Sequence, residues 1–321
     1  MSAPSIDTMM RLAIEQANTV KGTTYPNPPV GAVIVDHDGQ VAGVGATQPP
    51  GGPHAEVMAL RRAGTRAAGG TAVVTLEPCN HQGRTGPCVD ALLDAGVAAV
   101  VFAVSDLNPV AAGGAQRLTD AGVTVSSGVL ADEVCGGPLR EWLHRQRTGR
   151  PHVTWKFGAS IDGRSAAADG TSQWITGAAA RADVHRHRAV ADAIVVGTGT
   201  VLADDPTLTA RLPDGTLAAR QPLRVVVGER EISSESNILN DDSRTMVIRT
   251  HDPHPIDEFP HGSFRRRVGR TRCTTLSQQS QQAQTNDDEP SLEAKTKLRE
   301  KNHRHQPGAG LSRAPMRRNA S

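Results

Sequence analysis

Two short segments decide the fold of the first half of this chain: HAE at residues 54–56 and PCNHQGRTGPC at residues 78–88. The first segment follows a turn-forming run of prolines and glycines, so His54 and Glu56 are predicted to open a helix. Cys79 follows a β-rich run, and the second cysteine is expected to begin the next helix. The two segments therefore predict strand-to-helix connections that bring a histidine, two cysteines and a glutamate together.

Apolar residues elsewhere in the first half recur with the spacings of alternating strands and helices. A sheet covered by helices is the architecture that such alternation indicates. An Asp-Gly turn between the first two β-rich runs predicts a hairpin. Expected strands are 30–35, a run from 41, 71–75, 99–104 and 123–126, and expected helices are 6–17, 54–63, 88–95, 113–121 and 131–147.

Three candidate metal ligands, His54, Cys79 and Cys88, are typical of a catalytic zinc site. Catalytic zinc usually keeps three protein ligands and one open position, whereas structural zinc is closed by four. Bound zinc lowers the pKa of a water molecule to about 7, which makes a nucleophile available at neutral pH. Glu56 would then carry a proton from this water to the substrate and the leaving ammonia.

Zinc deaminases share the signature H-x-E followed by P-C-x-x-C, with the glutamate acting on protons and not as a ligand. Here eight residues separate the cysteines, in place of two. A structural zinc with His81 as fourth ligand is the alternative, and a chance H-x-E is another. The Pro-Cys context and the strand-to-helix placement favour the catalytic site.

Several motifs together resemble the bifunctional deaminase/reductase family of riboflavin biosynthesis. The resemblance covers roughly the first three quarters of the chain and ends near Arg249. The matching segments are NPPVG at 27–31, HAE at 54–56, PCNHQGRTGPC at 78–88, KFGASIDGR at 156–164, SQWIT at 172–176 and VGTGTVLADDPTLTAR at 196–211.

For the first domain, residues 1–147, the resemblance implies a cytidine-deaminase-like α/β/α fold. Its implied substrate is a diaminopyrimidinone with a ribosylamino 5'-phosphate, which is hydrolysed to the aminouracil. Asn27 and His81 would hold the pyrimidine edge, and Arg84 would approach the substrate from the loop between the cysteines. Without the resemblance, Asn27 would be a turn residue before a proline and Arg84 a solvated surface charge.

The second domain, residues 151–250, is expected to be an incomplete dihydrofolate-reductase-like α/β domain. The resemblance implies that it uses NADPH to reduce the ribosyl group to ribityl. A linker at 148–151 would precede it. Expected strands are 152–157, 193–197, 223–227 and 245–249, and the expected helix is 178–191.

The same resemblance assigns contacts in this second domain. Arginines suit the bidentate recognition of phosphate. Taken singly, Trp174 could instead be a core residue and Asp204 a turn cap. Implied cofactor contacts are Gly158, Trp174, Thr200 and Asp204, and implied substrate contacts are Lys156, Ser172, Arg188, Leu208 and Arg211.

The sequence departs from the family after Arg249. It lacks the further strands and the Glu-Gly-Gly-Pro-type loop that the family pattern requires. Residues 251–321 contain one valine and one isoleucine and are rich in polar side chains, which predicts a disordered tail. A shifted reading frame is our hypothesis for the origin of this tail. NADPH reduction is therefore expected to be weak or absent.

Composition narrows the alternatives. Lys and Arg number 35 against 33 Asp and Glu, and aromatic residues make up 2% of the chain, which argues against a polynucleotide deaminase with a basic, stacking channel. A non-catalytic reductase remnant that serves as a dimer scaffold is a further alternative. No apolar run is long enough to span a membrane and the start does not resemble a signal peptide, so we expect a cytoplasmic protein. The resemblance implies a small phosphorylated pyrimidine as its substrate, and we also expect a homo-oligomer.

Overall fold

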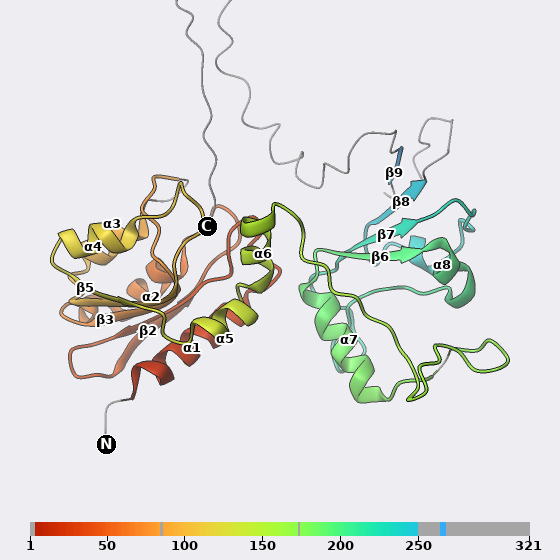
Figure 1. Ribbon diagram of the computed structural model, residues 1–321, viewed down its shortest axis with the longest axis horizontal. Coiled ribbons are helices and arrows are strands. Elements are labelled where there is room, and N and C mark those ends of the chain that lie inside the picture. The colour runs from red at the N-terminus through yellow and green to blue at the C-terminus, as the bar shows by residue number, and fades with distance from the viewer. Residues whose placement is uncertain (1–3, 84–85, 173, 250–263, 268–321) are drawn as a thin grey trace, which may run out of the picture. The chain divides into compact units, whose positions relative to one another are not determined.

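The computed structural model describes residues 4–83, 86–172 and 174–249, together with the backbone of 264–267 (Figure 1). These residues form two separate sheets, with strand orders β2-β1-β3-β4-β5 and β6-β7-β8-β9. The α/β class expected from the sequence is confirmed. Each sheet and its helices are described below by themselves.

The first sheet is mixed. Strand β1 pairs antiparallel with both β2 and β3, whereas β3, β4 and β5 run parallel. The expected hairpin is confirmed as β1 and β2, with an irregular register near Val35. The strands are β1 (Gly31–Val35), β2 (Val41–Ala46), β3 (Thr71–Leu76), β4 (Ala99–Val104) and β5 (Thr124–Ser127).

Helices cover both faces of this sheet. Figure 1 shows α1 and α5 together below the sheet and α3 and α4 above it, and α2 packs against α3. Ser5 accepts a hydrogen bond from the Thr8 N–H at 3.3 Å and so caps the first helix. The helices are α1 (Ile6–Thr19), α2 (Ala55–Ala63), the 3₁₀ helix η1 (Gly64–Ala67), α3 (Cys88–Asp94), α4 (Gly114–Asp120), α5 (Ala131–Gly136) and α6 (Arg140–Thr148).

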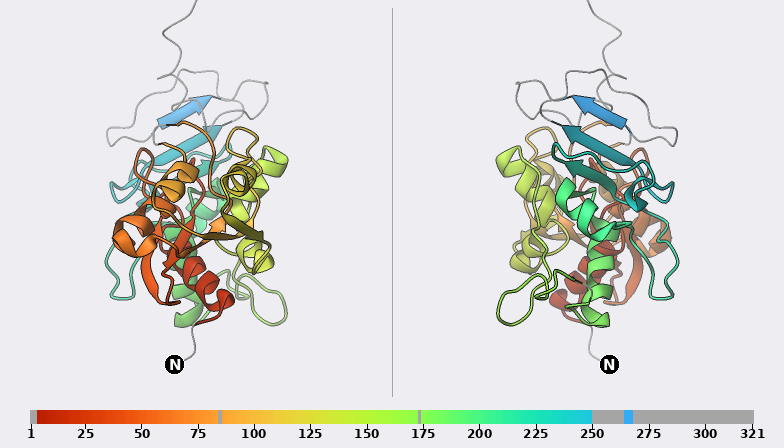
Figure 2. Two further views of the ribbon diagram at one scale, coloured as in Figure 1. Left: turned by 90° about the vertical axis from the view of Figure 1, so that its left-hand side faces the viewer. Right: turned by 90° about the vertical axis from the view of Figure 1, so that its right-hand side faces the viewer.

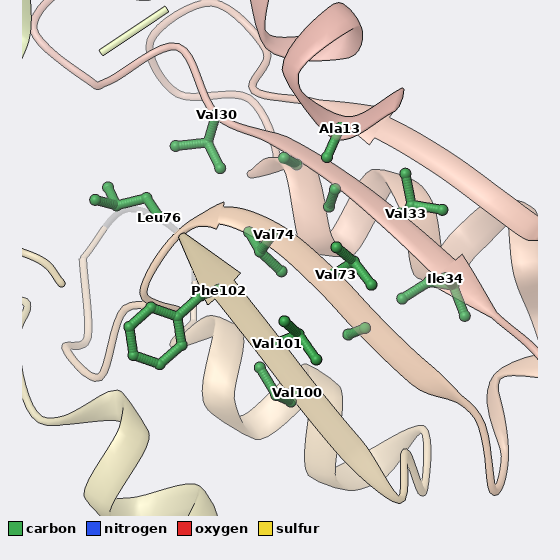
Figure 3. Packing of buried hydrophobic residues seen from close by; sticks show 14 of the residues in the cluster. Ala13, Val30, Val33, Ile34, Val73, Val74, Leu76, Val100, Val101 and Phe102 are labelled. Carbon is green, nitrogen blue, oxygen red and sulfur yellow. The ribbon is translucent and has the colours of Figure 1, made fainter. Parts of the chain in front are cut away.

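The core of the first domain is built on β1, β3 and β4. Strand β1 is buried along its whole length, as expected of a central strand whose two faces are both covered by helices. Val73, Val74 and Phe102 lie among the packed side chains that Figure 3 shows. In the described part of the chain this core cluster holds 28 buried apolar residues.

Glycines in β2 let helix α2 lie directly on the sheet. A Cβ at Gly43 would come within 2.3 Å of the Ala59 carbonyl oxygen. One at Gly45 would come within 2.3 Å of the Ala55 carbonyl oxygen. Since real Cβ atoms do not approach so closely, these two positions set the distance between α2 and β2.

The expectation of one helix over 131–147 was wrong. The structure has two helices there, α5 and α6, and residues 137–139 separate them. Pro138 explains the break, because proline lacks the N–H that a helix interior requires and disfavours helical backbone in the residue before it.

The second sheet is entirely parallel. Its core cluster within the described residues holds seven buried residues, among them Val226, Ile238 and Val247. Helix α7 buries none of its side chains. The elements are α7 (Ala178–Val190), β6 (Ala193–Gly197), α8 (Thr198–Asp204), β7 (Leu223–Val227), the 3₁₀ helix η2 (Asn237–Leu239), β8 (Thr245–Arg249) and β9 (Phe264–Arg267).

The expected strand at 152–157 was also wrong. These residues have no strand assignment, and Trp155 is 82% exposed. A strand is stable only when its N–H and C=O groups pair with a neighbour, and the described residues provide no such neighbour for this segment.

The expected disorder of 251–321 was wrong for one segment. Residues 264–267 form β9, which pairs in parallel with β8, and the two strands lie side by side in Figure 2. The free edge of β8 offers unpaired backbone groups that a further segment can join, whatever its side chains. The rest of the predicted tail lies outside the described residues.

Candidate metal centre

His54 and Glu56 are placed by the first turn of α2. His54 is the residue that precedes the helix, with extended backbone angles of φ −75° and ψ 167°. Glu56 is the second helical residue and is buried, at 4% exposed. The turn before the helix thus positions an imidazole and a carboxylate one residue apart, as the sequence predicts.

The two cysteines come from different elements. Cys79 lies in the loop after β3, and Cys88 is the first residue of α3. The backbone N–H of Cys88 donates to the Cys79 Sγ at 3.4 Å, and the Val89 N–H donates to the Cys79 carbonyl oxygen at 3.3 Å. These two bonds hold the start of α3 against the loop that carries the first cysteine.

His54, Cys79 and Cys88 converge on one point. Nδ1 of His54 lies 3.5 Å from the Cys79 Sγ and 3.3 Å from the Cys88 Sγ. The ligand atoms of the three residues all lie within 4.8 Å of one another. No other group of three or more such side chains close enough to hold a metal occurs in the described part of the chain.

This donor set fits zinc. Nitrogen and sulfur ligands on one tetrahedral zinc are about 3.5 Å apart, given bond lengths of about 2.0 and 2.3 Å, and both measured nitrogen-to-sulfur distances match. His81 does not belong to the three-residue group. The arrangement therefore favours the open, three-ligand site over a structural zinc with His81 as fourth ligand.

The electrostatics of the two cysteines are opposite. Hydrogen bonds from Cys88 and His54 lower the pKa of Cys79 to about 4. The bond to Cys79, together with burial, raises the pKa of Cys88 well above its ordinary value. The hydrogen bond with Cys79 also raises the pKa of His54. One thiolate is thus already stabilised, and this negative charge suits a cation.

Glu56 lies near the predicted metal ligands, and its buried environment disfavours the charged form of its carboxyl group. Burial, and then the negative charge of Cys79, raise the pKa of Glu56 to about 7. A carboxyl group that gains and loses a proton near neutral pH is suited to general acid and base chemistry. The position and the environment of Glu56 therefore agree with the role of proton carrier.

The structure places the other residues that were predicted for this site as follows. Asn27 is half-buried in the turn before β1, where its N–H donates to the Thr24 carbonyl oxygen at 2.8 Å. Nδ1 of His81 is buried and has no hydrogen-bond partner in the described structure. Arg84 lies outside the described residues. Their contacts with substrate remain predictions.

Two acidic residues near the metal centre, Asp106 and Glu77, were not predicted from the sequence. Asp106 lies after β4, and burial and then the nearby Glu77 raise the pKa of its carboxyl group, to which the Cys79 charge also contributes. Glu77 accepts from the Asp106 N–H at 3.2 Å. A signal was available: β3 and β4 are parallel neighbours, so residues that follow them meet at one sheet edge.

Comparisons with known proteins agree with both domains. A model of the cytidine and deoxycytidylate deaminase zinc-binding region matches residues 4–104, and a model of the RibD C-terminal domain matches residues 151–263. The chain is 68% identical over 252 residues to the riboflavin biosynthesis protein RibD of Mycobacterium tuberculosis, which covers 78% of this chain and 74% of that protein. The chain belongs to the RibD family.

Other RibD proteins are also similar. The Escherichia coli protein is 47% identical over 254 residues, or 76% of this chain and 69% of that protein. A Thermotoga maritima deaminase/reductase structure has a TM-score of 0.74 at 36% identity and covers 81% of this chain and 73% of that one. An Acinetobacter baumannii RibD structure has a TM-score of 0.70 at 42% identity, with 82% and 74% covered.

Membership in the RibD family confirms the resemblance drawn from the motifs. The family joins a zinc-dependent deaminase to an NADPH-dependent reductase in riboflavin biosynthesis, so the expected cofactors are those of the family. The polynucleotide-deaminase alternative is not favoured. No helix in the described ranges is long and apolar enough to cross a membrane.

Some of the predicted reductase residues of this RibD-family chain lie together. Ser172 Oγ donates to Asp204 Oδ1 at 2.8 Å, which joins a predicted substrate contact to a predicted cofactor contact. Arg188 donates to the carbonyl oxygen of Thr209 at 3.1 Å, between Leu208 and Arg211. Arg188, Leu208 and Arg211 thus gather around one loop.

The remaining predicted residues are more exposed. Trp174 is 71% exposed and is not a core residue, and the Arg181 guanidinium lies 4.4 Å from its ring centre. Lys156 and Thr200 are exposed, and Gly158 is half-buried. Their predicted contacts remain predictions.

The same loop has an unusual backbone. Leu208 has a φ of 52° although it is not glycine, and its side chain is buried. Sequence reasoning missed the residue that supports it, Arg224, which is fully buried on β7 and donates to the Thr207 carbonyl oxygen at 3.1 Å. The same guanidinium donates to Asn240 Oδ1 at 2.8 Å. A buried arginine in a strand is hard to predict, because its partners are backbone carbonyls and loop residues distant in sequence.

Proposed function

We propose that the first domain removes an amino group, as ammonia, from the diaminopyrimidinone that carries a ribosylamino 5'-phosphate. The product would be the corresponding aminouracil. The convergence of His54, Cys79 and Cys88 beside the buried Glu56 carries this proposal. The Thermotoga maritima relative is named as a deaminase of this substrate class, which supports it.

Each residue has a distinct role in this proposal. His54, Cys79 and Cys88 would hold zinc, which supplies a water molecule activated for attack at neutral pH. Glu56 would take a proton from that water and deliver it to the ring nitrogen, and would then take the remaining proton of the added hydroxyl group and pass it to the departing amino group. Burial raises the pKa of Glu56 toward neutrality, which suits a group that both takes and gives a proton near physiological pH.

Binding of the substrate would depend on the loops around this centre. Asn27 and His81 would hold the polar edge of the pyrimidine, and Arg84 would approach the substrate from the loop between the cysteines. The buried Nδ1 of His81, which has no partner in the described structure, supports this role, because such an atom is satisfied when a ligand binds to it.

The test compares Glu56→Gln with the parent protein. We expect the variant to keep its zinc and its fold, and its rate of ammonia release to fall by about 10²- to 10⁴-fold, the usual contribution of a general acid or base. Metal analysis and an ammonia assay measure the two properties. Glu15→Gln, an exposed substitution on α1, is the matched control. Turnover at the parental rate in Glu56→Gln would exclude Glu56 as the proton carrier.

For the second domain we propose that NADPH-dependent reduction of ribosyl to ribityl is weak or absent in this chain. The small core cluster, the exposed Trp174 and the end of the match to the RibD C-terminal domain at residue 263 support this. Absorbance at the NADPH band should stay constant when the deaminated substrate is added. Rapid NADPH oxidation would contradict the proposal.

A reductase remnant that serves only as a scaffold would bind NADPH poorly or not at all. Quenching of Trp174 fluorescence by NADPH separates such a scaffold from a working cofactor site. Variants that replace Trp142 and Trp155 would isolate the Trp174 signal.

We also propose that the protein is a cytoplasmic homo-oligomer. Exposed apolar residues such as Trp155 support the association of copies. Sedimentation velocity and cell fractionation test these two points.

A further inference from the structure

The loop between the two cysteines, residues 80–87, begins with a residue that is held in place twice. The backbone N–H of Asn80 donates to the Ala111 carbonyl oxygen at 2.9 Å. Its side-chain Oδ1 accepts from Arg117 Nη1 at 2.9 Å. Both partners lie outside the loop, so Asn80 is anchored to the segment that leads into α4 and to α4 itself.

Arg117 makes a second contact that involves the other cysteine. Its Nη2 pairs with Asp90 Oδ1 on α3, the helix that begins with Cys88. One guanidinium therefore joins the residue after the first cysteine to the helix that starts with the second. Arginine suits this bridge, because its planar group offers several donors in fixed directions.

Helix α4 is itself fixed against the cysteine loop. A Cβ at Gly114 would come within 1.9 Å of the Pro78 carbonyl oxygen, so the helix backbone lies directly on the residue before Cys79. The N–H of Ala115 donates to Glu77 Oε1 at 3.0 Å. Arg117 therefore extends from a support that is close to the metal centre and has little freedom to move.

The contribution of Arg117 to stability is expected to be small. The side chains of Arg117 and Asp90 are 43% and 44% exposed, and surface ion pairs usually contribute no more than about 1 kcal/mol. The contact with Asn80 suggests a role in the site instead, because the next residue is His81, whose Nδ1 is buried and has no hydrogen-bond partner in the described structure.

We propose that Arg117 is a positioning residue for deamination: by holding Asn80, it fixes the direction in which His81 faces the pyrimidine. This inference rests on the proposed function of the first domain and deepens it. Without the Arg117 bridge, the bound substrate must order the start of the loop, which weakens binding more than it slows chemistry.

The experiment is Arg117→Met. The KM for the diaminopyrimidinone phosphate should rise about tenfold, whereas kcat should stay within about twofold, as expected when binding alone is weakened. Zinc content and the urea midpoint should not change. Arg117→Lys should give an intermediate KM, because an ammonium group lacks the forked geometry that reaches both partners.

Three further variants complete the test, of which the first is a control. Arg140→Met removes an exposed arginine that pairs with Glu141 on α6 and should leave KM unchanged. Asn80→Ala should raise KM as Arg117→Met does, and the double variant should show no further rise, because both changes break the same bond. Additive effects in the double variant would overturn the proposal.

Binding measured in a Glu56→Gln background separates this inference from the proposed function. In that background, calorimetry gives the dissociation constant of the substrate without turnover. A tenfold increase in the dissociation constant on adding Arg117→Met supports the inference even if the parent protein releases no ammonia. Failure of the parent protein to release ammonia would contradict only the proposed function. An unchanged constant, no measurable binding in the Glu56→Gln background, or a loss of zinc and stability with Arg117→Met would overturn the inference.

Discussion

The two domains hold their functional residues by different means. The first has a core cluster of 28 buried apolar residues, against seven in the second, counted over the described parts of the chain. Helix α1 buries four side chains, whereas α7 buries none. In the first domain, apolar packing fixes the elements that carry the metal ligands. In the second, a polar network around the buried Arg224 supports the loop that contains Leu208.

This difference indicates which domain can hold catalytic groups in a fixed geometry. A catalytic group must be held to within a fraction of an ångström, which requires supporting elements that do not move. The first domain meets this condition. In the second domain the loop with the strained Leu208 is held by hydrogen bonds of the buried Arg224 and by a core cluster of only seven residues in the described part of the chain.

The largest effect should come from removing a ligand of the metal. In Cys88→Ser a weaker oxygen donor replaces one sulfur, so zinc binding should fail and ammonia release should drop at least about 1000-fold, since the metal contributes several kcal/mol to the reaction. Metal analysis and the ammonia assay measure both losses. Cys135→Ser on α5 lies outside the three-ligand group and should leave both unchanged. A Cys88→Ser protein that still binds zinc and releases ammonia would contradict the assignment of Cys88 as a required metal ligand.

A smaller effect concerns the two cores directly. Leu92 on α3 is fully buried, so Leu92→Ala should lower the free energy of unfolding by about 3 kcal/mol through lost burial and a cavity. Leu239 in η2 is 6% exposed and belongs to the smaller core cluster of the second domain, so Leu239→Ala should cost less, about 2 kcal/mol, because fewer buried residues surround it. Urea unfolding followed by circular dichroism measures both. Equal losses would mean that the second domain is as well packed as the first.

The smallest effect depends on pH. The backbone N–H of Gln40, and then Arg66, lower the pKa of the buried Asp36 carboxyl. A lowered folded-state pKa stabilises the fold above the ordinary value and loses this contribution as the pH falls through the lowered value. In Asp36→Asn the melting temperature should therefore depend less on pH between neutral and acid conditions. An exposed substitution, Asp94→Asn, should keep the parental pH profile.

The sequence predicted the elements that depend on local pattern. The hairpin of β1 and β2 follows from two β-rich runs around an Asp-Gly turn, and the metal ligands follow from H-x-E and the Pro-Cys context. These features need only neighbouring residues. The expected strand at 152–157 was wrong because pairing depends on partners distant in sequence, and β9 was missed because the polar composition after residue 250 gave no sign of its pairing with β8.

The support of the site was not predictable from pattern. Arg117 and Asn80 are 37 positions apart, and Glu77 and Ala115 are 38 apart. A sequence motif contains no sign of such pairs, because each residue alone is an ordinary surface or turn residue. The proline in the 131–147 segment was visible, by contrast, and should have divided that helix.

The close contact of α2 with β2 makes the metal centre dependent on a glycine outside it. A methyl group at Gly45 would lie within 2.3 Å of the Ala55 carbonyl oxygen, and Ala55 lies between His54 and Glu56, so relief of this contact should shift the start of α2. Cys79 and Cys88 belong to other segments and would stay behind. Gly45→Ala would thus move the imidazole away from both sulfurs without replacing any ligand. The distances between the zinc ligands therefore depend in part on the absence of a Cβ atom at one position of β2.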